Sequence, residues 1–179
     1  MYGSADPAEI ARRVDTFCAT YLGSPIDTYL FYESSQGGVS GVLLADGRRV
    51  IVKAHTPAWS ADFLRAVHQV QRYLAAHAFP CARPLLEPTQ LGHGYATVEE
   101  LVGEGDAADA HLPAVRGAMA AALAKVVIGT RSLRGTPGLQ SRMLTLLPPG
   151  ALWPVPHSPI FDFATTTEGA EWIPRRLER

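Results

Sequence analysis

Lys53 is the side chain in this sequence whose chemistry best suits the binding of an anion. The chain contains 16 lysines and arginines, and only Lys53 and Lys125 are lysines. A lysine carries a compact charge on a flexible stem and can reach between phosphate oxygens, whereas an arginine presents a wide planar fork. A lysine kept in an arginine-rich chain therefore favours a phosphate-binding role. The alternative is a lysine at a sheet edge that discourages aggregation.

The segment that contains Lys53 is predicted to be a β-hairpin with an apolar surface beside the ammonium group. Residues 41–54 are rich in β-branched side chains, and an Asp-Gly pair at 46–47 predicts a two-residue turn of the primed type. This turn places Val42 opposite Ile51, so that both share a face with Lys53. Such a face can hold a flat aromatic ring and reach the charged group attached to it. A nucleotide has this shape.

A glycine pair lies just before the hairpin. Gly37 and Gly38 fall between two predicted strands, where glycines allow backbone N–H groups to approach an anion closely. The predicted register also places Ser40 opposite Lys53. A glycine pair alone is weak evidence, but together with the lysine it favours a phosphate site.

The remaining reactive side chains form no recognisable cluster in the sequence. Glu99 and Glu100 are neighbours on a predicted strand and point to opposite faces, which argues against an acid–base pair. Two cysteines, Cys18 and Cys81, are too few for a disulfide framework and fit a reducing cytoplasm. The six histidines lack the spacing of metal ligands: His55, His68, His77, His93, His111 and His157.

Capping residues and hydrophobic spacing predict the elements that would position Lys53. Asp6 as N-cap, Pro7 at the first helical position and Gly23 as the stop predict a first helix. A second helix is predicted over residues 60–78, and its core-facing stripe consists of Phe63, Val67, Val70 and Leu74.

Five strands are expected around the second helix. Three are predicted between residues 28 and 54, and two more at 81–88 and 94–102. The order of three strands, helix and two strands predicts an α+β fold with a five-stranded antiparallel sheet. We expect residues 1–102 to form this lobe. Residues 103–179 are expected to form a hinge and a proline-rich helical segment, with an amphipathic helix that ends at Gly129.

Charge and hydropathy exclude several classes of partner. The formal net charge is -1 with 18% charged residues, and there is no dense basic run that would attract nucleic acid or an anionic membrane. The most apolar stretch, residues 118–129, is too short to span a bilayer, and no signal sequence is recognisable. These features predict a soluble, cytoplasmic protein that binds neither nucleic acid nor a membrane.

Three stretches together resemble the aminoglycoside phosphotransferase family and its small-molecule kinase relatives. They are "GVLLADGRRVIVKA", "VQRYLAAHAFPCARPLLEP" and "YATVEELVGEGDAADAHLP". The resemblance covers about residues 28–170. It implies a protein-kinase-like N-terminal lobe that binds ATP, followed by a hinge and the start of a helical C-terminal lobe. A complete homologue would pass the phosphoryl group to a small hydroxyl-bearing acceptor.

The resemblance also implies roles for individual residues. Lys53 would hold the α- and β-phosphates of ATP, and Val42 and Ile51 would enclose the adenine. At the end of the fifth strand, Val98 would be the gatekeeper, and the hinge would offer the carbonyl of Glu99 and the N–H of Leu101 to the adenine. The loop over the phosphates would consist of Gln36, Gly37, Gly38 and Ser40.

The sequence departs from the family pattern at two points. The family pairs its strand lysine with a glutamate on the following helix, yet residues 60–78 contain no glutamate, which leaves Gln71 as the candidate partner. Phosphoryl transfer in this fold also uses a His-x-Asp loop, an asparagine and a second aspartate for Mg²⁺. The chain has no asparagine and no His-x-Asp, and Asp162 in "DFA" has no catalytic loop before it.

Three interpretations of function follow. The first is the ATP-binding lobe of a small-molecule phosphotransferase, which ends before the catalytic loop and is inactive alone. In this interpretation Mg²⁺ would be bound only by the missing C-terminal half. The second is a non-catalytic nucleotide-binding or interaction module. The third is a truncated gene product, which the closing "WIPRRLER" favours.

Overall fold

The computed structural model describes residues 2–3, 6–34, 37–103 and 108–139, which belong to one compact unit. The fold is α+β, as predicted, and its centre is a five-stranded sheet. The segment around Asp162 and the rest of residues 140–179 lie outside the described residues.

The sheet is antiparallel throughout, with the strand order β1-β2-β3-β5-β4. This confirms the predicted five-stranded antiparallel sheet. The first and fourth strands in the sequence form its two edges. The strands are β1 (Ile26–Ser34), β2 (Gly37–Leu44), β3 (Arg49–His55), β4 (Pro84–Leu91) and β5 (Gly94–Glu100).

The turn between β2 and β3 differs from the prediction, and the difference changes the register. The N–H of Leu44 donates to the carbonyl of Arg48 at 2.8 Å, which closes a loop of three residues rather than two. Gly47, with φ of +87°, adopts the left-handed conformation that such a loop needs at its third position. Val42 therefore pairs with Val50, and Lys53 pairs with Val39. The predicted pairs of Val42 with Ile51 and of Ser40 with Lys53 are wrong.

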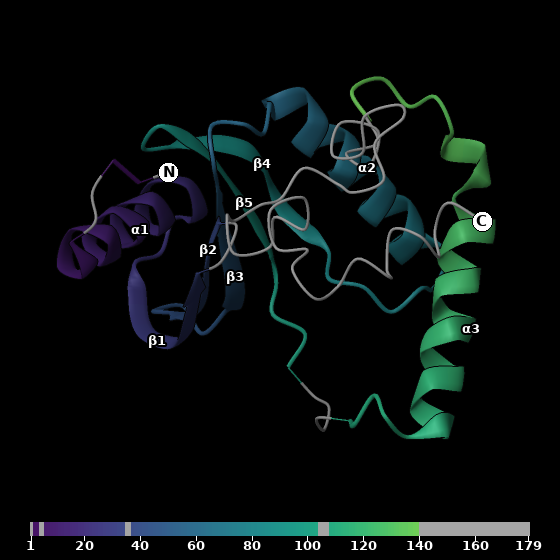
Figure 1. Cartoon of the computed structure of the whole chain (residues 1–179). Coiled ribbons are helices and arrows are strands. Elements are labelled where there is room, and N and C mark those ends of the chain that lie inside the picture. Colours follow the sequence, from purple (N-terminus) through teal and green to yellow (C-terminus); the bar gives the residue numbers. More distant parts are fainter. Residues whose placement is uncertain (1, 4–5, 35–36, 104–107, 140–179) are drawn as a thin grey trace, which may run out of the picture. The chain divides into compact units, whose positions relative to one another are not determined.

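Helix α1 (Pro7–Leu22) covers one face of the sheet and forms the main core with it (Figure 1). The predicted punctuation is confirmed, because the Asp6 side chain accepts from the N–H of Ala8 at 3.2 Å and Gly23 ends the helix with φ of +74°. Alternate residues of the central strands point to this core. It includes Val14, Phe17, Cys18, Val42, Leu44, Val50, Val52, Ala54, Ala96 and Val98.

Helix α2 (Ala61–Ala76) lies on the opposite side of the sheet from α1 (Figure 1). Ser60 caps it by accepting from the N–H of Phe63 at 3.2 Å. The predicted stripe is displaced. Leu74 is buried, but Phe63, Val67 and Val70 are only half-buried, whereas the residues buried with Leu74 are Leu64, Ala66 and His68. A search for apolar periodicity passes over a histidine, and this histidine lies at the centre of the buried face.

Helix α3 (Pro113–Gly129) is present and ends at Gly129 as predicted, before a short 3₁₀ turn, η1 (Arg131–Leu133). It is not the packed amphipathic helix that we expected, because none of its residues is buried. Met119 and Leu123, two of its large apolar side chains, are exposed. A helical C-terminal lobe is therefore not evident in the described residues. Among those residues, no helix combines the length and apolar character needed to cross a membrane.

Candidate functional site

The face of the sheet opposite α1 carries the polar side chains. Strand pairing places Val39 and Thr97 on either side of Lys53, and Ile51 beside Glu99, so that these five share this face. We call it the Lys53 face. A series of ring contacts joins it to α2: His55 of β3 contacts Trp59 at 6.2 Å between ring centres, and Trp59 contacts Phe63 at 4.9 Å.

An ion pair between Lys53 and Glu99 forms the centre of this face. The Nζ of Lys53 donates to Oε2 of Glu99 at 2.7 Å. The Glu99 side chain is only 6% exposed, whereas that of Lys53 is 34% exposed. The carboxylate therefore has little access to water, while the ammonium can meet a ligand without leaving its partner.

Glu99 takes the place that we assigned to Gln71. The carboxylate comes from β5 instead of from the helix. The observed register sets Glu99 beside Ile51 of the neighbouring strand β3, and Ile51 is two residues before Lys53 on that strand. Gln71 is not the hydrogen-bond partner of Lys53, and its side-chain oxygen is buried without a partner among the described residues. From the sequence we expected Glu99 to contribute only its backbone carbonyl, and the role of its side chain was not predicted.

Two histidines that are far apart in the sequence flank this pair. His55 exchanges a hydrogen bond of 2.9 Å with the hydroxyl of Thr97. Burial, and next the charge of Lys53, lower the pKa of His55 to about 4. Burial likewise lowers the pKa of His68, with a further contribution from Arg72. Both rings are therefore neutral at pH 7, and the fold brings together histidines that the sequence analysis treated as scattered.

The apolar part of the Lys53 face differs from the predicted pair. Ile51 lies on this face, but Val42 is fully buried in the core on the other face, as its register with Val50 requires. Gly41 lies opposite Ile51, and a Cβ at Gly41 would come within 2.2 Å of the Phe31 ring. The side chain beside Ile51 across the sheet is therefore Phe31, which is 38% exposed.

The predicted phosphate loop is only partly on the correct face. Ser40 pairs with Val52 and is 1% exposed, so its hydroxyl lies in the core and not beside Lys53. Gly38 also belongs to the core face, where a Cβ would meet the Tyr2 hydroxyl at 2.3 Å. Gly37 shares the Lys53 face and pairs with His55. Gln36 lies outside the described residues. Packing against Tyr2 thus accounts for one glycine of the pair.

The structure also differs from the prediction at the hinge after the fifth strand. Val98 is fully buried on the core face, opposite Val52, so it cannot be a gatekeeper beside Lys53. The N–H of Leu101 donates to the carbonyl of Arg49 at 3.1 Å, which extends the ladder between β3 and β5. An adenine could take this donor only if that bond opened.

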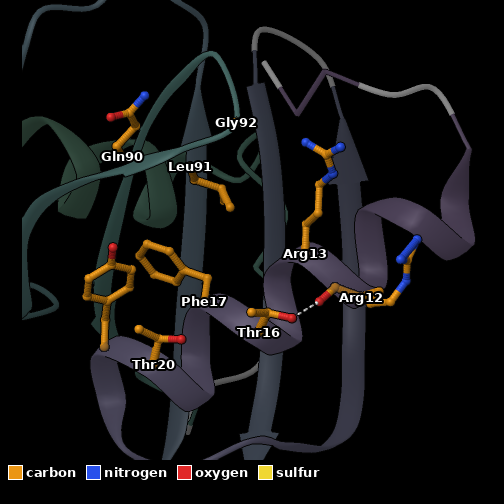
Figure 2. Close-up of a pocket in the computed structure, with 9 residues that line it drawn as sticks. Arg12, Arg13, Thr16, Phe17, Thr20, Gln90, Leu91 and Gly92 are labelled. Atoms are coloured by element: carbon orange, nitrogen blue, oxygen red, sulfur yellow. Dashed lines mark hydrogen bonds between the residues drawn. The ribbon is translucent and has the colours of Figure 1, made fainter.

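A surface hollow of about 370 Å³ lies between α1 and the turn from β4 to β5, as Figure 2 shows. Arg12 and Arg13 contribute from the helix, and Gln90 from the strand. Both arginines pair with Glu9, and Arg13 also donates to the carbonyl of Tyr2 at 2.7 Å. Both arginines are thus already paired within α1 and the segment that precedes it. The hollow lies on the α1 side of the sheet, away from Lys53.

The described residues hold no group of three or more histidine, cysteine, aspartate or glutamate side chains that could bind a metal ion. The chemistry available on the Lys53 face is the binding of an anion by a positioned ammonium group.

Comparison with known proteins agrees with this chemistry. Residues 36–176 match the model of the phosphotransferase enzyme family. The matched range includes Lys53, Glu99 and both flanking histidines. No curated protein matches the sequence.

Proposed function

The chain belongs to the phosphotransferase enzyme family, and on this basis we propose that its N-terminal lobe, residues 1–102, binds ATP through the Lys53 face. Members of this family generally use ATP as the phosphate donor. The ion pair between Lys53 and Glu99 is the observation that carries the proposal, because it holds a partly exposed ammonium at a defined position on the sheet.

The hydrogen-bonding capacity of Lys53 suits a phosphate ligand. An ammonium group has three donors, and one of them is used by Glu99. The other two can bind phosphate oxygens by charge-assisted hydrogen bonds, which are about twice as strong as neutral ones. The buried carboxylate fixes the lysine stem and so lowers the entropy that the lysine would lose on binding.

The adenine would lie on the apolar part of the same face. Ile51 is half-buried, and Phe31 lies over Gly41 directly across from it. We propose Ile51, Phe31 and Val39 as the adenine surface, in place of Val42. An exposed aromatic ring next to a β-branched residue can stack against a purine.

Phosphoryl transfer itself needs groups that residues 1–179 lack. They contain no asparagine and no His-x-Asp sequence, and the described residues hold no metal cluster. We therefore propose that these residues bind nucleotide but transfer little or no phosphate alone. The same observation favours the second candidate function, a non-catalytic nucleotide-binding or interaction module. The acceptor, an aminoglycoside or another small alcohol, is not fixed by family membership.

A thermal-shift titration with ATP, with and without Mg²⁺, tests the proposal. ATP at about a hundred times its dissociation constant should raise the free energy of unfolding by roughly 2.7 kcal/mol. The variant Lys53→Ala should lose most of this gain. Lys125→Ala is the matched control, because Lys125 is the other lysine and lies exposed on α3.

Two results would decide between the candidates. If ATP stabilises neither the wild type nor Lys125→Ala, the lobe does not bind ATP and both nucleotide-binding functions are excluded. If ATP binds, incubation with radiolabelled ATP and a panel of aminoglycosides should yield no labelled acceptor. Labelled product would instead show that catalysis proceeds without the expected loop.

A further inference from the structure

His68 is a buried polar side chain with unmet hydrogen-bonding capacity. It is 1% exposed, and neither ring nitrogen has a hydrogen-bond partner among the described residues. Buried side-chain nitrogens in folded proteins nearly always have a partner, and an unpaired one carries the full cost of its lost hydration. His68 lies at the centre of the buried face of α2, where burying its ring nitrogens without partners destabilises the fold. The presence of a histidine at this position therefore needs an explanation.

The charged side chains around His68 include two carboxylates, Glu87 and Glu99, and these have different partners. Arg72 from α2, Glu87 from β4, and Glu99 and Lys53 on the Lys53 face all act on the His68 ring. Arg72 and Glu87 bind each other. The His55 ring, whose pKa is also lowered by His68, shares a hydrogen bond with the hydroxyl of Thr97.

Glu99 differs from these groups because its one partner is the ammonium that a ligand would engage. It accepts a hydrogen bond from Lys53 through Oε2 at 2.7 Å. A phosphate that binds Lys53 competes for the ammonium and weakens the bond to Glu99. The Glu99 side chain, with 6% exposure, keeps its bond to Lys53 but gains from a second donor, because a buried carboxylate whose pairing is weakened is unfavourable.

We propose that His68 is a positioning residue for Lys53: once a nucleotide phosphate engages the ammonium, the His68 ring donates a hydrogen bond to the Glu99 carboxylate. This inference rests on the proposed function, since it needs a phosphate at Lys53. This hydrogen bond would satisfy both the ring N–H and the carboxylate. The helix thus acts on Lys53 through an imidazole and Glu99, without a glutamate of its own.

The proposal predicts that the histidine is unfavourable without ligand and useful with it. His68→Leu removes the unpaired nitrogens and keeps an apolar side chain of similar size. We expect this variant to be as stable as the wild type or more stable without ATP, and to bind ATP about tenfold more weakly. His68→Gln keeps an N–H donor, and its affinity should stay within about threefold of the wild type. His93→Leu, at an exposed histidine, is the control and should change neither quantity.

Isothermal titration gives the affinities, and NMR of the imidazole nitrogens of the wild type reports on the ring without any substitution. On saturation with ATP we expect the His68 signals to shift to those of a hydrogen-bonded ring and its pKa to rise, because the ring then faces a carboxylate that has lost part of its partner. A purely structural histidine would show neither change.

The outcomes separate this inference from the proposed function. If the wild type binds ATP but His68→Leu binds it equally well, or if the His68 signals do not move, the positioning role is wrong and ATP binding stands. If the wild type binds no ATP, both fall. If His68→Leu does not fold, the affinity of His68→Gln and the wild-type NMR titration still decide, and unmoved signals overturn the inference.

Discussion

At the scale of single residues, Glu99 shows that a sheet can provide the carboxylate that a lysine needs. Diagonal neighbours on one face of an antiparallel sheet lie about 7–8 Å apart, which long side chains can bridge, so a glutamate on β5 can reach a lysine on β3 as readily as a helix residue can. The observed Nζ to Oε2 distance is 2.7 Å. Because Glu99 is the more deeply buried partner, the two members of the pair should contribute unequally to stability.

We predict that Lys53→Met destabilises the fold more than Glu99→Gln does. The first change leaves a buried carboxylate unpaired, at a cost of about 2 kcal/mol, below the value for a fully buried pair because Lys53 is one-third exposed. The second leaves an ammonium that water can reach, at a cost of about 0.5 kcal/mol. The double variant should regain most of the loss. Urea unfolding of the four proteins measures this coupling, and simply additive losses would show that the pair adds nothing.

At the scale of elements, the sequence predicts which segments form helices and strands but not how the strands are paired. The Asp6 cap, the Gly23 stop and the β-branched runs act locally, so their effects are visible in the sequence. The Asp-Gly pair at 46–47 is compatible with loops of two or of three residues, and only the left-handed Gly47 in the folded chain distinguishes them. A slip of one residue moves every side chain to the other face.

That slip accounts for the wrong placement of Val42 and Ser40 at the candidate site. Lys53 and Ile51 lie on one strand, two residues apart, so their common face follows from the strand alone. Val42, on β2, was assigned to the Lys53 face through the predicted register with β3, and the observed register places it on the other face. Glu99 and His68 could not be recognised at all, because their proximity to Lys53 depends on the packing of β5 and α2. The alternation of Thr97 and Glu99 along β5 was the available signal, but it needed the correct register.

We predict unequal effects of alanine at two glycines in the sheet. A Cβ at Gly94 would lie 2.2 Å from the backbone carbonyl oxygen of His55, so Gly94→Ala must displace β3 and should cost about 3 kcal/mol. A Cβ at Gly41 would meet the ring of Phe31, which is partly exposed and can rotate away, so Gly41→Ala should cost about 1 kcal/mol. Denaturant midpoints of the two variants test this order. A smaller loss at Gly94 would mean that β3 and β5 are not rigidly paired.

At the scale of the whole described molecule, the two faces of the sheet have different roles. The α1 face forms an apolar core, and the removal of its apolar side chains from water stabilises the fold. The Lys53 face buries an ion pair and two neutral histidines, groups that contribute little net stability and that respond to ligand and to pH. Changes in proton concentration between pH 7 and pH 4 should therefore act on the fold through this second face.

The stability of the protein should fall as the pH decreases from 6.5 to about 4, and His55 should account for part of the loss. The pKa of His55 is about 4 in the fold and 6.5 in its absence, so in this interval the unfolded chain binds a proton that the folded chain does not. Above pH 6.5 both states are neutral and the contribution is complete. Below pH 4 both are protonated and no further loss arises from this group.

The variant His55→Gln isolates this contribution, because glutamine can still bond Thr97 but does not titrate. Its urea midpoint should fall less than that of the wild type between pH 7 and pH 4.5, while carboxylates and His68 affect both proteins alike. His93→Gln, at an exposed histidine, should follow the wild type. Parallel curves for the wild type and His55→Gln would mean that His55 takes up its proton in the folded chain as readily as in the unfolded one, and that the Lys53 face is open to water there.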